Sequence, residues 1–198
     1  MKTWIEIHRD RLLHNLEVFR QQTTGKVMMV VKANAYGHGL DPVIPLIGQA
    51  KEIDYLVVDS VAEGLLCQRL GAGKPILVIG WTDRDEIEAL VGAGLETVAA
   101  SEEHLKTILG VARKLKRTAR VHLKIETGTS RLGVDPLRLP ALLPLLASPW
   151  VEWVGAYSHF ANIEDTTDST YAMYQLGVFK KALADLPVQP QFRHFSCS

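Results

Sequence analysis

The sequence has few cysteines, no net charge and no long apolar run, and each shortage excludes a class of protein. Its two cysteines, Cys67 and Cys197, lie far apart and form no CxxC or Cys/His cluster. This spacing predicts no metal site and fits a reducing cytoplasm. The 22 basic residues balance 22 acidic ones, so no net field favours nucleic acid or an anionic membrane. Proline and charged residues break every long apolar stretch, and the start, MKTWIEIHRD, lacks the apolar region of a signal peptide.

Short apolar runs alternate with amphipathic stretches along the 198 residues, a length that suits one domain. The runs predict strands at 27–33, 54–60, 75–80, 97–101, 120–126, 153–159 and 192–197. The amphipathic stretches predict helices at 8–20, 40–51, 61–71, 84–93, 102–116, 136–147 and 168–185. Repeated strand–helix units of this kind predict a parallel sheet of the α/β class.

Two α/β architectures compete for this pattern, an open doubly wound sheet and a (β/α)8 TIM-type barrel. No GxGxxG follows the first strand, which weakens the dinucleotide-binding version of the open sheet. Residues suited to chemistry occur at the ends of several strands, which favours the barrel. About seven strands are predicted, so we expect an incomplete barrel with unpaired edges.

The segment VVKANAYGHG, Val30 to Gly39, places a lysine behind an apolar run. The run predicts a buried strand, and Lys32 would stand at its carboxyl end, the edge where α/β proteins bind ligands. Burial favours the neutral amine, which is the form that makes a Schiff base. The alternative is an ordinary strand-end lysine that reaches solvent. Gly37 and Gly39 allow positive φ or a close approach of the backbone.

These ten residues resemble the cofactor-lysine motif of the alanine racemase family, whose members use pyridoxal 5′-phosphate (PLP). The resemblance implies that Lys32 bonds PLP and that the Tyr36 phenol contacts its phosphate. The alternative for Tyr36 is a half-buried aromatic residue at the rim of the barrel.

A second segment, HLKIETGTSRLGV at 122–134, is similar to another signature of the same family. Taken alone, Lys124 would pair with Glu126 or face solvent. The resemblance implies instead that Lys124 is carbamylated and orients Arg131, which faces the PLP phenolic oxygen and the substrate carboxylate. Glu126, Thr129 and Ser130 depart from the commonest family pattern, so details of this loop and the substrate preference are expected to differ.

Two further residues complete the expected site. His159 ends an apolar strand, where a core histidine bonded to a carbonyl is the alternative; the family places a histidine here beside the PLP ring. Ser198, four residues after His194, takes the position of a serine that binds the PLP phosphate. The resemblance thus implies Lys32, Arg131 and His159 as catalytic residues and adds Tyr36 and Ser198 to the cofactor contacts.

The same resemblance implies an isomerase that interconverts L- and D-alanine in the cytoplasm and supplies D-alanine for the cell wall. Residues 1–198 are expected to form an N-terminal PLP-binding barrel domain truncated before its last strand, with a β-rich C-terminal domain absent. A second proton-transfer residue, a tyrosine, would come from that domain in a homodimer, so the chain alone is expected to be weak or inactive. Alternatives are a racemase of serine or another small amino acid, a non-catalytic PLP-binding barrel of the homeostasis type, and a structural fragment.

Overall fold

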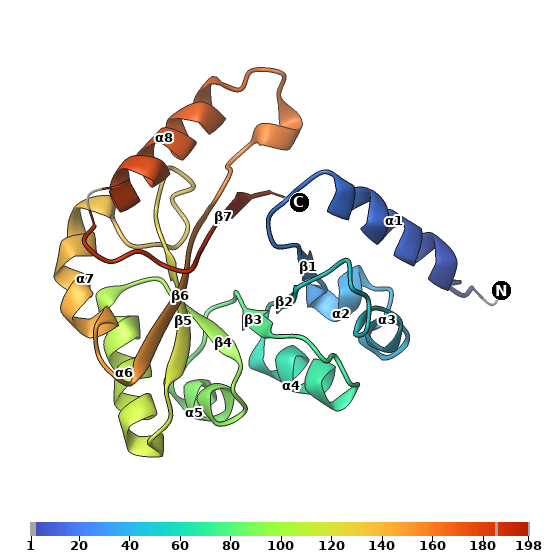
Figure 1. Ribbon diagram of the computed structural model, residues 1–198, viewed down its shortest axis with the longest axis horizontal. Helices are drawn as coiled ribbons and strands as arrows, with labels where there is room; N and C mark the ends of the chain where they lie inside the picture. The colour runs from blue at the N-terminus through green and yellow to red at the C-terminus, as the bar shows by residue number, and fades with distance from the viewer. Residues whose placement is uncertain (1–2, 185, 198) are drawn as a thin grey trace. The chain divides into compact units, whose positions relative to one another are not determined.

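Strands and helices alternate along the computed structural model, which describes residues 3–184 and 186–197 (Figure 1). The strands are β1 (Met28–Val30), β2 (Tyr55–Val58), β3 (Ile76–Val78), β4 (Glu96–Ala99), β5 (Ala119–Lys124), β6 (Val151–His159) and β7 (Phe192–Ser196). The α-helices are α1 (Arg9–Gln21), α2 (Lys32–Tyr36), α3 (Leu40–Ile47), α4 (Val61–Arg69), α5 (Arg84–Gly92), α6 (Glu102–Leu115), α7 (Leu139–Leu146) and α8 (Thr170–Ala184), with 3-10 turns η1 (Pro136–Arg138) and η2 (Ile163–Asp165). The order of the strands in the sheet, β1 to β7, is their order in the chain, which confirms the predicted α/β class.

All seven predicted strands are present, and the largest error concerns the first. The prediction ran through 27–33, whereas β1 spans Met28–Val30 and Lys32 already belongs to α2. The strand ends early because Val31, with φ −125° and ψ 20°, already leaves the extended conformation, and Ala33 to Tyr36 then have positive φ. Lys32 therefore follows the strand instead of ending it.

Local sequence signals account for where several helices begin. The Ser101 hydroxyl accepts the backbone N–H of His104 at 3.1 Å and caps α6. Pro136 and Pro140 lie in the first positions of η1 and α7. Proline is tolerated there because the backbone N–H that it lacks has no partner within the helix. None of the helices in the described ranges has the length and apolar character needed to cross a bilayer.

The chain divides into two compact units, one that ends at Glu96 and one that begins at Thr97. In the first unit β1, β2 and β3 pair in parallel, with Met29 opposite Leu56 and Leu56 opposite Ile76. All four residues of β2 are buried, as expected for a strand covered on both faces. Leu56 and Ile44 of α3 are both 0% exposed, and burial of each such side chain stabilises the fold by about 1.5–3 kcal/mol.

In the second unit β5, β6 and β7 pair in parallel, and β6 carries an irregularity. Val121 lies opposite Trp153, but the next residue, His122, lies opposite Gly155. Val154 is therefore an extra residue in β6, as in a β-bulge. After it the register is regular, with Lys124 opposite Tyr157.

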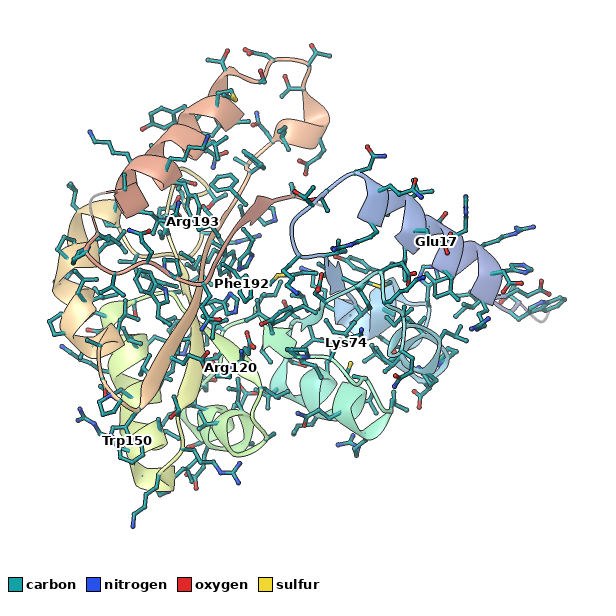
Figure 2. All side chains as sticks on the ribbon, in the orientation of Figure 1. Glu17, Lys74, Arg120, Trp150, Phe192 and Arg193 are labelled. Carbon is teal, nitrogen blue, oxygen red and sulfur yellow. The ribbon has the colours of Figure 1, made fainter. Side chains whose placement is uncertain are left out.

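The amino-terminal ends of these strands are held by ordinary polar contacts. Arg120 of β5 pairs with Glu152 of β6, with 3.2 Å between Nε and Oε2, and Gln191 donates to the same carboxylate at 2.9 Å. Trp150 lies at this end, directly before β6 (Figure 2). The residues predicted to carry the chemistry belong to the other, carboxyl end of the strands.

Candidate functional site

The predicted site residues form one group in each unit. Lys32 and Tyr36 belong to the first unit and follow β1. The second unit contributes Lys124 at the end of β5, Arg131 in the loop that follows, and His159 at the end of β6. Ser198 lies outside the described residues.

The segment after Lys32 is a left-handed helical turn, although the sequence analysis treated it as a plain loop. Ala33, Asn34, Ala35 and Tyr36 have φ of 51°, 56°, 54° and 53°. Each such residue costs about 1–2 kcal/mol relative to the right-handed conformation because Cβ approaches the following carbonyl. Four in succession need compensating contacts.

Side-chain contacts from Asn34 and Glu63 hold this turn. One carboxylate oxygen of Glu63, in the first turn of α4, accepts the backbone N–H of Asn34 at 2.9 Å, and the other accepts that of Asp59 at 3.0 Å. The Asn34 side-chain oxygen accepts the N–H of Leu40 at 2.8 Å. Ala35 is buried, so the turn is fixed from both sides. It follows that the backbone around Lys32 and Tyr36 is rigid and strained.

Lys32 and Tyr36 present their polar groups to whatever occupies this edge. Lys32 is half-buried and Tyr36 is 52% exposed. Within residues 3–184 and 186–197, neither the Lys32 amine nor the Tyr36 hydroxyl forms a hydrogen bond or ion pair. An amine and a phenol on a rigid turn can therefore both be directed to a ligand.

In the second unit a row of side chains crosses three strands. Lys124, Tyr157 and His194 lie opposite one another in the register of β5, β6 and β7. The Lys124 amine is 5.6 Å from the centroid of the Tyr157 ring, within cation–π range, and the same ring stacks on His194 at 4.8 Å. Lys124 is 5% exposed, so the interpretation in which it faces solvent is wrong.

Arg131 lies near the same tyrosine. Burial raises the pKa of the Tyr157 phenol above its ordinary value, and the positive charge of Arg131 acts in the opposite direction. Lys124 and Arg131 thus have a common neighbour in Tyr157. Tyr157 is buried, and no local pattern in the sequence indicates that both basic side chains lie near it.

The Glu126 carboxylate shapes the loop that carries Arg131. It accepts the backbone N–H of Gly128 and forms hydrogen bonds with the backbone N–H groups of Thr129, Ser130 and Arg131. Partial burial raises its pKa, yet these donors together bring the pKa below the ordinary value. Glu126, which departs from the commonest family pattern, therefore fixes the conformation of 128–131 through hydrogen bonds to the backbone.

A pair of histidines that sequence reasoning missed lies beside this row. His122 Nδ1 and His194 Nε2 are 2.9 Å apart. Burial, and then the neighbouring His122, lower the pKa of His194 to about 3, so the His194 ring is neutral at pH 7 and one of the two rings donates to the other. The contact needs glycine at 155, because a Cβ there would lie 2.2 Å from His122 Nδ1.

His159 contacts a backbone carbonyl, as the interpretation of it as a core histidine predicted. Its Nδ1 lies 2.6 Å from the Phe160 carbonyl oxygen. In a neutral ring this contact places the proton on Nδ1 and makes Nε2 the acceptor. The ring is half-buried, so an orientation fixed by the backbone does not prevent contact with a ligand.

Comparison with known proteins identifies similar chains. Residues 7–198 match the family described as the N-terminal domain of alanine racemase. An alanine racemase of Symbiobacterium thermophilum is 36% identical over 97% of this chain and 52% of its own length. The solved structure of alanine racemase from Bacillus anthracis has a TM-score of 0.87 at 26% identity and covers 98% of this chain and 51% of its own. A histidine racemase of Leuconostoc mesenteroides has a TM-score of 0.85 at 28% identity over 94% of this chain and 50% of its own. The chain spans about half the length of the relatives it matches.

Proposed function

Because this chain belongs to the alanine racemase family, we propose that residues 1–198 form the PLP-binding barrel domain of an amino-acid racemase that acts on alanine. The observation that carries the proposal is the rigid left-handed turn after β1, which presents the Lys32 amine and the Tyr36 phenol at the carboxyl end of a parallel strand. Ligands bind at this edge in α/β barrels. The racemase activity is proposed for the whole protein, a homodimer in the cytoplasm that supplies D-alanine.

The side chains present fit PLP by their chemistry. A primary amine can bond the aldehyde of PLP, a phenol can donate to its phosphate, and a guanidinium can bind its phenolic oxygen. Lys32, Tyr36 and Arg131 supply these groups, and His159 supplies an imidazole for the pyridine side. When bound, PLP supplies a ring that withdraws electrons from Cα of an amino acid.

The residues of this chain then have separate tasks in racemisation. The Lys32 amine takes a proton from Cα, or returns one, on one face of the substrate. Arg131 holds the substrate carboxylate, for which its planar fork is suited. Racemisation needs a second proton-transfer group on the opposite face, which we assign to a tyrosine of the partner subunit.

We assign to Lys124 the role of carbamate carrier. The neutral amine would form an N–C bond to CO₂ as one C=O π bond opens to C–O⁻, and an N–H proton would pass to water, which changes a neutral buried group into an anion. Its location supports this assignment, because Lys124 is 5% exposed and shares the neighbour Tyr157 with Arg131. An anion there would attract the guanidinium, whereas a protonated amine would repel it.

Covalent trapping of PLP tests the proposal without any need for turnover. The chain is incubated with PLP, reduced with borohydride and digested, and the modified peptide is identified by mass spectrometry. We expect the label at Lys32, and its loss in Lys32→Ala. Lys51→Ala, which removes an exposed lysine of the same unit, is the matched control and should label as the unchanged chain does. Equal labelling of Lys32→Ala and the unchanged chain would refute the assignment.

A racemase of another amino acid is the second candidate, because the histidine racemase covers 94% of this chain, against 98% for the alanine racemase, at nearly the same TM-score. Assays of the whole protein with L-alanine, L-serine and L-histidine separate the candidates. The preferred substrate is the one with the highest kcat/KM, and a preference for histidine or serine would replace alanine in the proposal.

A further inference from the structure

A buried amide on α8 contacts both segments of the second unit that carry proposed site residues. Gln175 is 0% exposed. Its Nε2 donates to the His159 carbonyl at 3.2 Å and to the Thr127 hydroxyl at 3.4 Å. Its Oε1 accepts the backbone N–H of Ala161 at 3.0 Å. Both amide hydrogens and the carbonyl oxygen are thus used, which is close to the full capacity of the side chain.

One helical turn earlier, Tyr171 contacts the same loop from the same helix. Its hydroxyl donates to the Gly128 carbonyl at 2.8 Å. A Cβ on residue 128 would lie 2.3 Å from this hydroxyl, and Gly128 has a φ of +129°, so the contact depends on glycine. Tyr171 and Gln175, at i and i+4, therefore face the same side of α8 and bind 127–128 at two adjacent points.

The buried face of α8 gives no packing reason for an amide. Its other buried members, Ala172, Phe179 and Leu183, are apolar, and an apolar side chain of similar size would avoid the desolvation of a polar group. The amide adds directional hydrogen bonds, which an apolar side chain cannot form. It joins the Thr127 hydroxyl, four residues before Arg131, to the carbonyl of His159 and the backbone N–H of Ala161. The Thr127 and Ser158 hydroxyls, 2.7 Å apart, add a direct link between the same segments.

We propose that Gln175, assisted by Tyr171, is a positioning residue that fixes the Arg131 loop and the His159 strand end to α8 as one unit. The inference rests on the proposed function for what Arg131 and His159 do. Gln175 itself touches neither substrate nor cofactor. Its effect is to prevent the two segments from moving independently, because each would lose hydrogen bonds to the same amide.

Hydrogen exchange followed by mass spectrometry tests the positioning role directly. Gln175→Met keeps the size of the side chain but removes the amide, and with it the hydrogen bonds that the amide donates and accepts. The substitution removes one hydrogen bond to 127 and two to 159–161, so we expect exchange of 126–133 and of 159–163 to quicken by about tenfold, which corresponds to about 1.4 kcal/mol. Tyr171→Phe, which removes only a hydroxyl from a 41% exposed side chain, should quicken exchange in 126–133 alone.

Phe179→Leu is the control, since it lowers packing on the same buried face without touching the amide. Turnover of alanine per folded molecule of the whole protein should fall at least about tenfold in Gln175→Met and stay within about twofold in Phe179→Leu. The inference is overturned if Gln175→Met quickens exchange no more than Phe179→Leu does, or if both variants lose turnover equally. Failure of the proposed function would appear separately, as absence of the PLP label at Lys32 in the unchanged chain.

Discussion

The His122–His194 pair, in which His122 is buried and His194 half-buried, predicts that the second unit loses stability in mild acid. His194 has a pKa of about 3 in the folded chain, against an ordinary value of 6.5. Between these values the unfolded chain binds a proton that the folded chain does not, so the free energy of unfolding falls as pH falls. This stability is fully present above about pH 6.5. At about 1.36 kcal/mol per pKa unit, lowering the pH to 5 removes about 2 kcal/mol.

Urea unfolding at pH 7, 6 and 5 measures this loss. The range avoids the carboxylates with lowered pKa, such as Asp54 and Glu126, whose ordinary values are 3.8 and 4.5. His194→Gln keeps a polar partner for His122 but cannot titrate, so we expect a lower stability at pH 7 and a much flatter pH dependence. His14→Gln, at an exposed position, should behave as the unchanged chain does. If His194→Gln loses stability between pH 7 and 5 as steeply as the unchanged chain, the reasoning is refuted.

Three further substitutions test other features. Gly155→Ala should lower the free energy of unfolding by about 1–3 kcal/mol, because the new Cβ would lie 2.2 Å from His122 Nδ1. An unchanged free energy of unfolding in urea would contradict this and show that the strand accommodates the methyl group. Glu126→Gln should lower the free energy of unfolding by about 1–3 kcal/mol at pH 7. The difference from the unchanged chain should narrow as the pH falls below 4.5, the ordinary pKa of this carboxyl, because the lowered pKa stabilises the fold only while the carboxyl is ionised. A difference that does not depend on pH would contradict this. Ala33→Gly should raise the melting temperature, and Ala33→Val should lower it, because residue 33 has a φ of 51°; the opposite order would show that the turn is not strained.

The alternation of strands and helices could be predicted because it depends on neighbouring residues. Apolar runs and amphipathic periodicity are local signals, and the seven strands follow them. The turn after Lys32 could not be predicted, since alanine and tyrosine favour right-handed backbone and the compensating carboxylate, Glu63, lies 29 residues from Asn34. Such contacts between distant residues leave no local pattern.

The site was predicted by residue type and only partly by surroundings. The signatures picked out Lys124 and Arg131, and the burial of Lys124 agrees with the resemblance and not with the solvent-facing alternative. The roles of Lys32, Tyr36 and His159 remain predictions. The link between His122 and His194 spans 72 residues, and only the register of β5, β6 and β7 brings them together.

The extra residue in β6 decides which side chains can meet. Successive residues of a strand point to opposite faces, so a shift of one position exchanges the faces. If Val154 paired regularly with His122, Lys124 would lie opposite Ala156, and Tyr157 and His159 would turn to the other surface of the sheet. Deletion of Val154 should therefore give a regular ladder that still has Lys124 opposite Tyr157, and a natural homologue that lacks this residue would keep its aromatic and imidazole groups at the same register positions.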